Sequence, residues 1–392
     1  MANVSSSNGL EKRPKLRFPG FDEPWKICKA ESLFRNITDK NHPDDTVLTI
    51  VQGKGTLPRD KSGRNIHYDD ASLSNYKRVE KGDFIIHLRS FEGGLEMAHE
   101  TGIVSPAYTI LRCSKPHSSL FYEAYFHTDE FINHILSKAV EGIRDGRQIS
   151  YEAFKWLGIP YCTNAEQEKI SGLFDAINRR IEKQEQIVNA LKKYKRGLLS
   201  YVFEEMTLSD NADSTTYHFS EIAQRRKEKY SPDSGIEYPC IELEHIEQGT
   251  GRLLGSVSST TQSSIKTVAR SGDVLFGKLR PYLRKFAFTE QDIVCSSEIW
   301  AFVPSEYVIP KYLYYLVQTE HFLRVANISS GTKMPRAEWA NIEKEPFGIP
   351  CILIQEKIVS ILEAIDKKIC TSSDSLKMLI NFRKGLLQQL FI

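Results

Sequence analysis

The chain has 392 residues, of which 41% are hydrophobic and 26% are charged, and this length predicts two or three globular domains. Lys and Arg number 52 against 50 for Asp and Glu, so a nucleic-acid partner would have to be bound through local basic patches and not through net charge. The seven cysteines show no Cys-x-x-Cys pair and no zinc-type spacing, which favours a reduced, cytoplasmic protein without a metal site. No apolar leader and no run of about 18 apolar residues is present, so secretion and membrane insertion are disfavoured.

The first part of the chain is expected to form one globular domain. Residues 1–13 are rich in Ser, Asn and Lys and are expected to be disordered, and the domain is expected at 14–158. Strand-like runs at 46–55 and 82–88 precede a run at 121–137 with helical spacing of its apolar residues. This mixture indicates an α+β domain.

A long helix is predicted in a central helical region at residues 159–205. Apolar residues recur there every seven positions, interrupted by one glutamine, and a second series falls four residues after each of them, which is a heptad pattern. The pattern Thr163-x-x-Glu166 is typical of a capping box, so we expect the helix to run from about 164 to about 203. The first series comprises Ile170, Ile177, Gln184, Leu191 and Leu198.

The second part of the chain follows the same plan. A second α+β domain is expected at 206–347, with strand-like runs at 272–279 and 298–304 and a helical run at 312–326. A C-terminal helical region is expected at 348–392. Its heptad series comprises Ile358, Ile365, Ser372, Leu379 and Leu386.

An internal repeat relates the two parts. The tetrapeptide QEKI at 167–170 recurs at 355–358, an offset of 355 minus 167, or 188 residues, and this offset holds without a gap until Phe203 matches Phe391. Upstream, KGDFIIHLRS at 81–90 resembles SGDVLFGKLRP at 271–281. The chain therefore consists of a duplicated unit, a globular domain followed by a long helix.

Matched interruptions in the two heptad series bear on how the helices pack. Gln184 matches Ser372 and Lys195 matches Arg383, and matched polar residues fix the register of paired helices. This favours a coiled coil over a plain amphipathic helix that packs only on its own domain. If the globular domains lie at opposite ends, the two helices must be antiparallel.

No motif of an enzyme active site is found, so no catalytic residue is predicted. The sequence lacks a phosphate-binding loop, an [DN]-P-P-[YFW] tetrapeptide, an H-E-x-x-H pair and a Gly-x-Ser-x-Gly elbow. The sequence also lacks the motif of a restriction-type nuclease, an acidic residue with an acid-x-Lys nearby. Gly53-Lys54-Gly55 lacks the third glycine of a dinucleotide loop and is interpreted as a hairpin turn.

Binding chemistry is indicated by basic residues, which cluster in RSGDVLFGKLRPYLRK at 270–285 around Tyr282. Guanidinium groups can read guanine edges and lysines can bind phosphates, although solvated strand edges also carry such cations. In the repeat Arg89 corresponds to Arg280. The candidate DNA-binding residues are Arg89, Arg144, Arg147, Lys278, Arg280, Arg284, Lys285, Lys333 and Arg336.

Several of these segments together resemble the specificity (S) subunits of type I restriction-modification systems. PKLRFPGF followed by Trp25 is similar to the family's opening, and SFEGGLEMAHETGIVSPAY at 90–108 and KLRPYL at 278–283 are similar to its target-recognition domains. EQEKI with LKKYKRGLLSYVF, and QEKI with INFRKGLLQQLF, are similar to its two helical regions. The second helical region departs from the first at CTSSDS, residues 370–375.

The resemblance implies two target-recognition domains held apart by an antiparallel helical pair, each reading half of a gapped, bipartite DNA site. It implies a non-catalytic subunit that binds double-stranded DNA, two methyltransferase (M) subunits and restriction (R) subunits. S-adenosylmethionine, ATP and Mg would be bound by those partners and not by this chain. Leu173, Ile187, Tyr194 and Tyr201, apolar residues outside the heptad series, are candidates for the methyltransferase contact or for burial under the globular domains.

Two other classes of function remain open from the sequence. One is a free-standing DNA-binding regulator without methyltransferase partners. The other is a coiled-coil adaptor without a nucleic-acid role, in which the basic loops would be dispensable.

Overall fold

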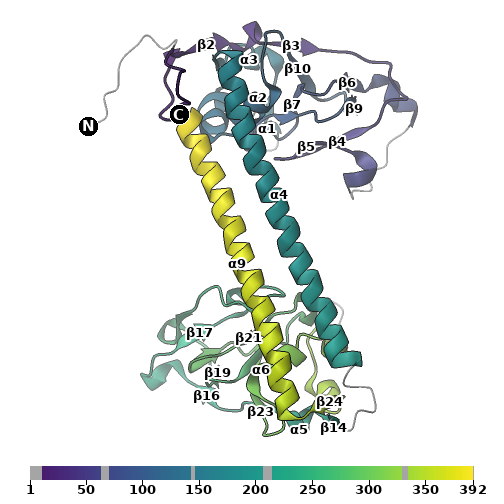
Figure 1. The fold of residues 1–392 in the computed structure, drawn as a ribbon, viewed down its shortest axis with the longest axis vertical. Coiled ribbons are helices and arrows are strands. Elements are labelled where there is room, and N and C mark those ends of the chain that lie inside the picture. The colour runs from purple at the N-terminus through teal and green to yellow at the C-terminus, as the bar shows by residue number, and fades with distance from the viewer. Residues whose placement is uncertain (1–10, 63–69, 143–145, 206–213, 329–333, 392) are drawn as a thin grey trace. The chain divides into compact units, whose positions relative to one another are not determined.

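The computed structural model describes residues 11–62, 70–142, 146–205, 214–328 and 334–391. The chain divides into two compact units (Figure 1). Unit 1 comprises residues 1–184 and 375–392, and unit 2 comprises residues 185–374. The division falls inside both long helices, so each unit contains one segment of each helix.

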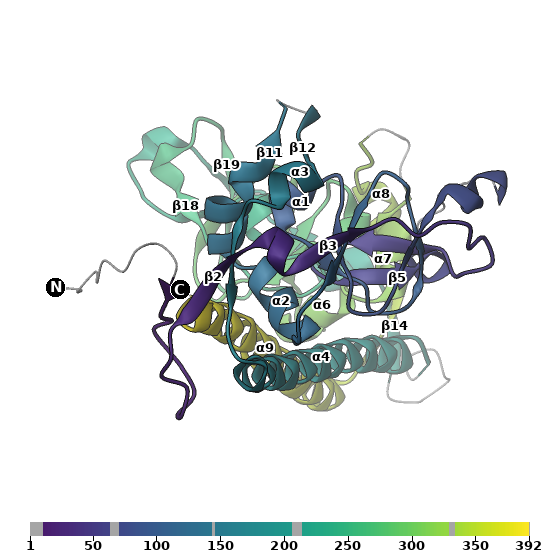
Figure 2. The same cartoon turned by 90° about the horizontal axis from the view of Figure 1, so that it is seen from above.

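Unit 1 is built on short antiparallel sheets covered by short helices. Its central sheet has the order β3 (Phe34–Ile37), β10 (Thr109–Cys113), β7 (Phe84–Ile86) and β8 (Glu96–Met97). Further sheets are β1 (Glu11–Lys12), β2 (Trp25–Lys29) and β13 (Gly158–Tyr161), the hairpin β4 (Leu48–Val51) with β5 (Gly55–Pro58), the pair β6 (Lys77–Val79) and β9 (Gly102–Val104), and the pair β11 (Val140–Glu141) and β12 (Gln148–Ile149). Its short helices include α1 (Ser90–Gly93), α2 (Ser119–Phe126) and α3 (Tyr151–Phe154). Figure 2 shows β2 and β3 following one another along the purple part of this unit.

The core of unit 1 is strongly aromatic. Trp25, Phe34, Phe84 and Tyr122 are buried there together with residues from the last turn of the chain. Each such ring removes roughly 150–250 Å² from water, so removal of one costs about 3–5 kcal/mol of stability. Because the rings come from β2, β3, β7 and α2, this core holds the sheets and helices of the unit together.

Unit 2 is built on a four-stranded and a five-stranded sheet. The first has the order β15 (Ala223–Arg225), β23 (Ile299–Pro304), β20 (Val274–Gly277) and β21 (Phe286–Phe288). The second has the order β16 (Lys229–Tyr230), β19 (Lys266–Ala269), β22 (Ile293–Cys295), β17 (Pro239–Ile241) and β18 (Val257–Ser258), and β14 (Ser214–His218) pairs with β24 (Pro346–Pro350). The helices between them are α5 (Phe219–Ile222), α6 (Pro310–Leu316), α7 (Glu320–Ala326) and α8 (Trp339–Ile342).

The two long helices are α4 (Asn164–Ser200), which continues as a π-helical turn at Tyr201–Glu205, and α9 (Ile352–Phe391). The main-chain N–H of Glu166 lies 3.4 Å from Thr163 Oγ1, as the capping pattern predicts. The other hydrogen bond of a capping box, from the Thr163 N–H to the Glu166 side chain, is wrongly predicted. The Glu166 carboxylate accepts instead from Arg17 at 2.9 and 2.8 Å and from the Trp25 indole at 3.0 Å. Glu166 thus anchors the N-terminal segment to α4.

Both predicted helical runs are interrupted by a threonine. Thr128 separates α2 from a π-helical turn at Glu130–Ile135, and Thr319 separates α6 from α7. Each threonine hydroxyl accepts from the main-chain N–H three residues later, at 3.2 Å in both cases. A side chain that takes over this N–H replaces an intrahelical bond and starts a new helix.

The expectation that residues 1–13 are disordered is wrong for the end of this segment. Glu11 and Lys12 form β1, which pairs with β2, and the Lys12 ammonium lies 2.5 Å from Glu130. The ladder and the ion pair fix these residues although their composition is polar. Residues 1–10 lie outside the described residues.

The heptad positions are buried or half-buried in the unit to which each belongs. Ile170 and Ile177 are buried in unit 1, and Ile358 and Ile365 are buried in unit 2. The remaining positions, Gln184, Leu379 and Leu386 in unit 1 and Leu191, Leu198 and Ser372 in unit 2, are half-buried. Within the described part of the chain, no helix is long and apolar enough to cross a bilayer.

Candidate nucleic-acid interface

Two basic loops of unit 2 are joined by main-chain hydrogen bonds. The N–H of Arg280 donates to the carbonyl of Pro335 at 2.8 Å, and the N–H of Ala337 donates to the carbonyl of Lys278 at 2.8 Å. The loop after β20 therefore lies against the loop before α8. This pairing brings the predicted residues Lys278, Arg280, Arg284, Lys285 and Arg336 together, and we call these five residues the unit 2 platform.

Three cations of the unit 2 platform are held by neighbours. The Arg336 guanidinium forms a fork with Glu298, with Nε–Oε2 3.0 Å and Nη2–Oε1 3.3 Å. Arg284 Nη2 lies 2.9 Å from a Glu320 oxygen, and Lys285 Nζ donates to the Leu243 carbonyl at 2.6 Å. The fork orients Arg336 before any ligand arrives, and bonding to the Glu298 carboxylate raises its pKa.

The other two cations are free to take a ligand. Among the described residues, no side-chain hydrogen bond or ion pair engages Lys278 or Arg280. Arg280 adopts a left-handed backbone with φ 51°, and so does Arg284 at the other end of the Pro281–Leu283 turn. Left-handed conformations of non-glycine residues cost on the order of 1 kcal/mol each and cluster at functional sites, which makes this turn a candidate binding element.

In unit 1 the structure places two of the predicted cations beside one short helix, α1. Arg89 precedes α1, and its side chain is 74% exposed, 3.8 Å from Glu92. The Arg147 guanidinium lies 4.3 Å from the centre of the Phe91 ring of α1, a cation–π contact. Arg89 and Arg147 therefore lie close together. The remaining predictions, Arg144 and Lys333, lie outside the described residues.

A buried ion pair lies directly behind this surface of unit 1. The Glu96 carboxylate is fully buried and accepts from the main-chain N–H groups of Gly53 at 2.6 Å and Gly55 at 2.9 Å. His127 Nε2 lies 3.3 Å from the same carboxylate, and His127 Nδ1 lies 2.8 Å from the Glu123 carbonyl. Because both ring nitrogens face acceptors, this site favours the imidazolium form of His127, which donates from both.

The pKa values of the pair agree with this proton count. Burial lowers the pKa of His127, but the hydrogen bond and the charge of Glu96 outweigh it, so the pKa lies above its usual value. Burial likewise raises the pKa of Glu96, but His127 and the two glycine N–H groups bring it below its usual value. The stabilisation from His127 is therefore lost as pH rises through its raised pKa, and that from Glu96 is lost as pH falls through its lowered pKa.

We accordingly expect the thermal stability of unit 1 to fall as pH rises above the usual histidine value of about 6.5. His99, whose pKa Glu123 raises through a hydrogen bond, adds to this fall, while burial lowers the pKa of His87, which stays neutral here. A pH series of melting temperatures for the wild type and His127→Gln isolates the pair, because glutamine still donates to Glu96 but does not titrate. Parallel curves for the two proteins would contradict the assignment of a charged His127.

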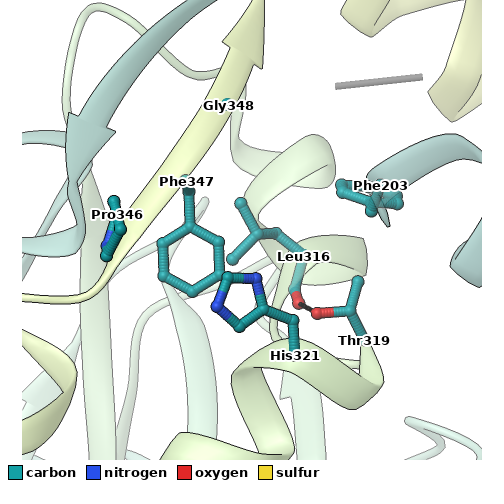
Figure 3. A pocket seen from close by; sticks show the side chains of 7 residues that line it. All are labelled: Phe203, Leu316, Thr319, His321, Pro346, Phe347 and Gly348. Carbon is teal, nitrogen blue, oxygen red and sulfur yellow. Dashed lines mark hydrogen bonds between the residues drawn. The ribbon is translucent and has the colours of Figure 1, made fainter. Parts of the chain in front are cut away.

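A pocket of unit 2 is lined by Phe203, Leu316, Thr319, His321, Pro346, Phe347 and Gly348. The His321 imidazole lies against the Phe347 ring, with centroids 4.7 Å apart (Figure 3). Its Nε2 lies 2.7 Å from Glu345 Oε1. The other residues that line the pocket are mostly apolar.

Two residues of the interface were missed from the sequence. Glu298 and Glu96 act as partners of basic or main-chain groups that lie far from them along the chain. One feature of the sequence could have identified Glu96, which is the single acid in the short, mostly apolar run LEMA at 95–98. A lone carboxylate in such a run indicates burial with a partner, although not which partner.

Comparisons with known proteins agree with these features. Residues 212–378 match the family model of the type I restriction modification DNA specificity domain. The HindI specificity subunit of a type I restriction enzyme from Haemophilus influenzae is 26% identical over 135 residues, 32% of this chain and 29% of that protein. The EcoDI specificity subunit from Escherichia coli is 26% identical over 153 residues, 38% of this chain and 33% of that protein. The chain thus spans about a third of the length of the curated relatives it matches.

Two solved structures share the fold at low sequence identity. The S subunit of a type I restriction-modification system from M. genitalium is 14% identical, with a TM-score of 0.57 over 97% of this chain and 99% of that one. A chain from a study of complex assembly and conformational transition of the type I R-M system is also 14% identical, with a TM-score of 0.57 over 96% and 99%. The family match, the relatives and the shared fold together confirm that this chain is similar to the specificity subunits of type I restriction-modification systems, as its sequence motifs predict.

Proposed function

We propose that this chain is the DNA-sequence-recognition subunit of a type I restriction-modification complex. The observation that carries the proposal is the unit 2 platform, in which the side chains of Lys278 and Arg280 have no partner among the described residues and lie inside the segment that matches the specificity-domain family. Each unit would read one half of a gapped, bipartite site. Because the two units differ at most positions, the half-sites would differ too.

We also propose that the two units arose by duplication, and matched contacts support this. Gln167 is fully buried, accepts from a main-chain N–H just before α2 and donates to a carbonyl before α4, at 3.0 and 2.9 Å. Gln355 makes the same two bonds before α6 and α9, at 2.9 and 2.8 Å. Asp83 and Asp273 each immediately precede a central strand, β7 or β20, and each accept an arginine fork. The four-stranded sheets have the same order when their strands are matched along the chain.

We propose that α4 and α9 form an antiparallel coiled coil that sets the spacing between the two DNA-reading units. In unit 1 the ring of Phe174, early in α4, stacks at 6.2 Å on Phe391 at the end of α9. In unit 2 Lys195, late in α4, bonds Asp366, which is nearer the start of α9. Both contacts have the order that an antiparallel pair requires.

Inserting one heptad after Gln184 is therefore expected to change the gap between half-sites, or to abolish activity, and to leave the half-sites themselves unchanged. A continuous helix gains about 10 Å from seven residues at 1.5 Å each, which is about three base pairs. The methylation motif of the variant complex, compared with that of the wild type, measures the gap. An unchanged motif would contradict the role of the helices as a spacer.

We propose that exposed apolar residues of the long helices bind the methyltransferase subunits. Ile187, Tyr194 and Tyr201 are 47%, 61% and 53% exposed and recur every seven residues along α4 and the π-helical turn that continues it in unit 2. On α9 in unit 1, Phe382 is 55% exposed and matches Tyr194 in the repeat. Leu173 is partly buried against the unit 1 core. Of the four apolar residues predicted outside the heptad series, it is therefore the one that fits burial under a globular domain. Two equivalent aromatic positions fit two partner subunits.

Tyr194→Asp and Phe382→Asp are each expected to weaken capture of the methyltransferase by about tenfold or more, because aromatic residues dominate interface energies. Thermal stability should change little, since both side chains are exposed. Lys192→Asp, also exposed and on another face of α4, is the matched control. Co-purification with methyltransferase subunits and a melting curve measure both effects, and equal capture by all three variants would rule out this docking surface.

We further propose that the chain contributes no catalysis and acts in the cytoplasm, and that S-adenosylmethionine, ATP and Mg are bound by the methyltransferase and restriction subunits. Selection of DNA from a random pool tests the function against its alternatives. The complete complex is expected to select one gapped motif. A site selected by the isolated chain alone would indicate a regulator, and no selection in either state would indicate an adaptor.

A further inference from the structure

The β4–β5 hairpin of unit 1 ends in a tip whose shape depends on glycine. Gly53 and Gly55 have φ of 74° and 73°, and the N–H of Lys54 between them donates to the Val51 carbonyl at 2.8 Å. A Cβ on Gly55 would lie 2.3 Å from the His99 ring. The tip therefore packs closely on its neighbours while the Lys54 side chain is exposed.

A buried charge holds this tip from below. The Glu96 carboxylate accepts from the N–H groups on both sides of Lys54 and is balanced by the His127 imidazolium. Burying an ion pair is costly, and a two-stranded hairpin closes without one. The pair holds the main chain on both sides of Lys54, from which the exposed side chain projects.

The tip is continuous with the basic surface of unit 1. A Cβ on Gly93 of α1 would lie 2.0 Å from the Gln52 side chain, so the tip packs against the short helix that Arg89 precedes. Arg147 stacks on Phe91 of the same helix. Lys54, Arg89 and Arg147 thus border one surface.

The corresponding connection of unit 2 is built differently. Between β17 and β18 the chain runs through residues 242–256. This loop contacts the end of the Pro281–Leu283 turn, where the Gly249 N–H donates a hydrogen bond to the Arg284 carbonyl at 2.9 Å. The arginine at Arg89 and Arg280 is common to both units, and the unit 2 connection also turns through two glycines, Gly249 and Gly251, with φ of 70° and 75°. Thr250 stands between them where unit 1 has Lys54, and the Gly249 N–H donates to a main-chain carbonyl and not to a buried acid. A residue that both units share cannot explain why their half-sites differ, but one that they do not share can.

Resting on the function proposed above, we propose that Lys54 is a specificity-determining residue that donates to an acceptor edge of a base, such as guanine O6 or N7, in the half-site of unit 1. Glu96 and His127 are its positioning residues. A phosphate contact tolerates a freely moving lysine, because phosphates line every sequence alike. A base contact requires a fixed approach, which the clamped tip provides.

The test is selection from a random DNA pool by the complete complex carrying Lys54→Ala, Lys54→Arg or Glu96→Gln. Lys54→Ala is expected to lose about tenfold of preference at one base pair of one half-site, with the other half-site unchanged. Lys54→Arg should keep the preference, since it still donates to guanine, and Glu96→Gln should show a smaller loss at the same base pair. Lys81→Ala, exposed in the same unit, is the matched control.

Three results would overturn the inference. Unchanged half-sites for Lys54→Ala would show that Lys54 makes no base contact. A uniform loss of affinity, with the motif intact and a smaller salt dependence, would identify a phosphate contact instead. A wild-type complex that selects no gapped motif would refute the proposed function itself, and this inference with it.

Discussion

Charge reversal of both free cations, Lys278→Glu with Arg280→Glu, is expected to lower the affinity of the complete complex for its DNA site by about a hundredfold or more. Each lost contact of this kind costs roughly 1–3 kcal/mol, and the new carboxylates also repel the phosphates. The fold should persist, because neither side chain forms an internal ion pair among the described residues. Affinity at one fixed salt concentration, together with a melting curve, separates lost binding from lost folding.

Two variants serve as controls for this reversal. Lys344→Glu changes an exposed lysine of unit 2 outside the unit 2 platform, and it should leave affinity nearly unchanged. Arg336→Glu also breaks the fork with Glu298, so it should lower both affinity and stability. If the double reversal binds as tightly as Lys344→Glu, the unit 2 platform is a solvated surface and not a DNA contact.

Lys195→Ala is expected to destabilise unit 2 by about 3–5 kcal/mol, the cost of leaving one partner of a buried ion pair alone. Lys195 is only 7% exposed, and its ammonium lies 2.7 Å from Asp366 and 2.9 Å from Oε1 of the Gln318 side chain. Burial lowers its pKa, although Asp366 opposes the shift. Tyr315 also donates to Asp366, at 3.0 Å, so the alanine variant leaves a half-buried carboxylate with one donor fewer.

The double variant Lys195→Met with Asp366→Asn tests this explanation of the loss. It removes both charges and keeps an acceptor for Tyr315, so it should recover most of the lost stability. Denaturant unfolding of the wild type, the single variant and the double variant gives the three free energies of unfolding. A loss below about 1 kcal/mol in Lys195→Ala would show that the pair behaves like an exposed one.

Much of the helical organisation could be predicted from the sequence because its signals are local. The heptad series and Thr163 placed α4 at residues 164 to about 203, and the structure has it at Asn164–Ser200 with a further turn. The hairpin at Gly53–Gly55 is confirmed by the pairing of β4 with β5. Lys195, singled out as a polar interruption of the heptads, bonds Asp366 of α9, which is the contact that would fix register in unit 2.

The details that decide which cations are free could not be predicted, because they depend on residues distant in the chain. Arg336 and Glu298 are 38 residues apart, and Arg284 and Glu320 are 36 apart. A sequence pattern gives the cations but not their partners, so paired and free arginines look alike. The breaks at Thr128 and Thr319 were missed for another reason, since apolar spacing continues across them and a threonine is only a weak signal of a cap.

The central claim, that this chain directs DNA modification to one sequence, is tested most directly by mapping N6-methyladenine across the genome of the source organism with and without its gene. We expect deletion to remove methylation from one gapped, asymmetric motif, and restoring the gene to return it. Loss of the motif would give both half-sites and the gap between them in one measurement. An identical set of methylated motifs in the two genomes would contradict the claim.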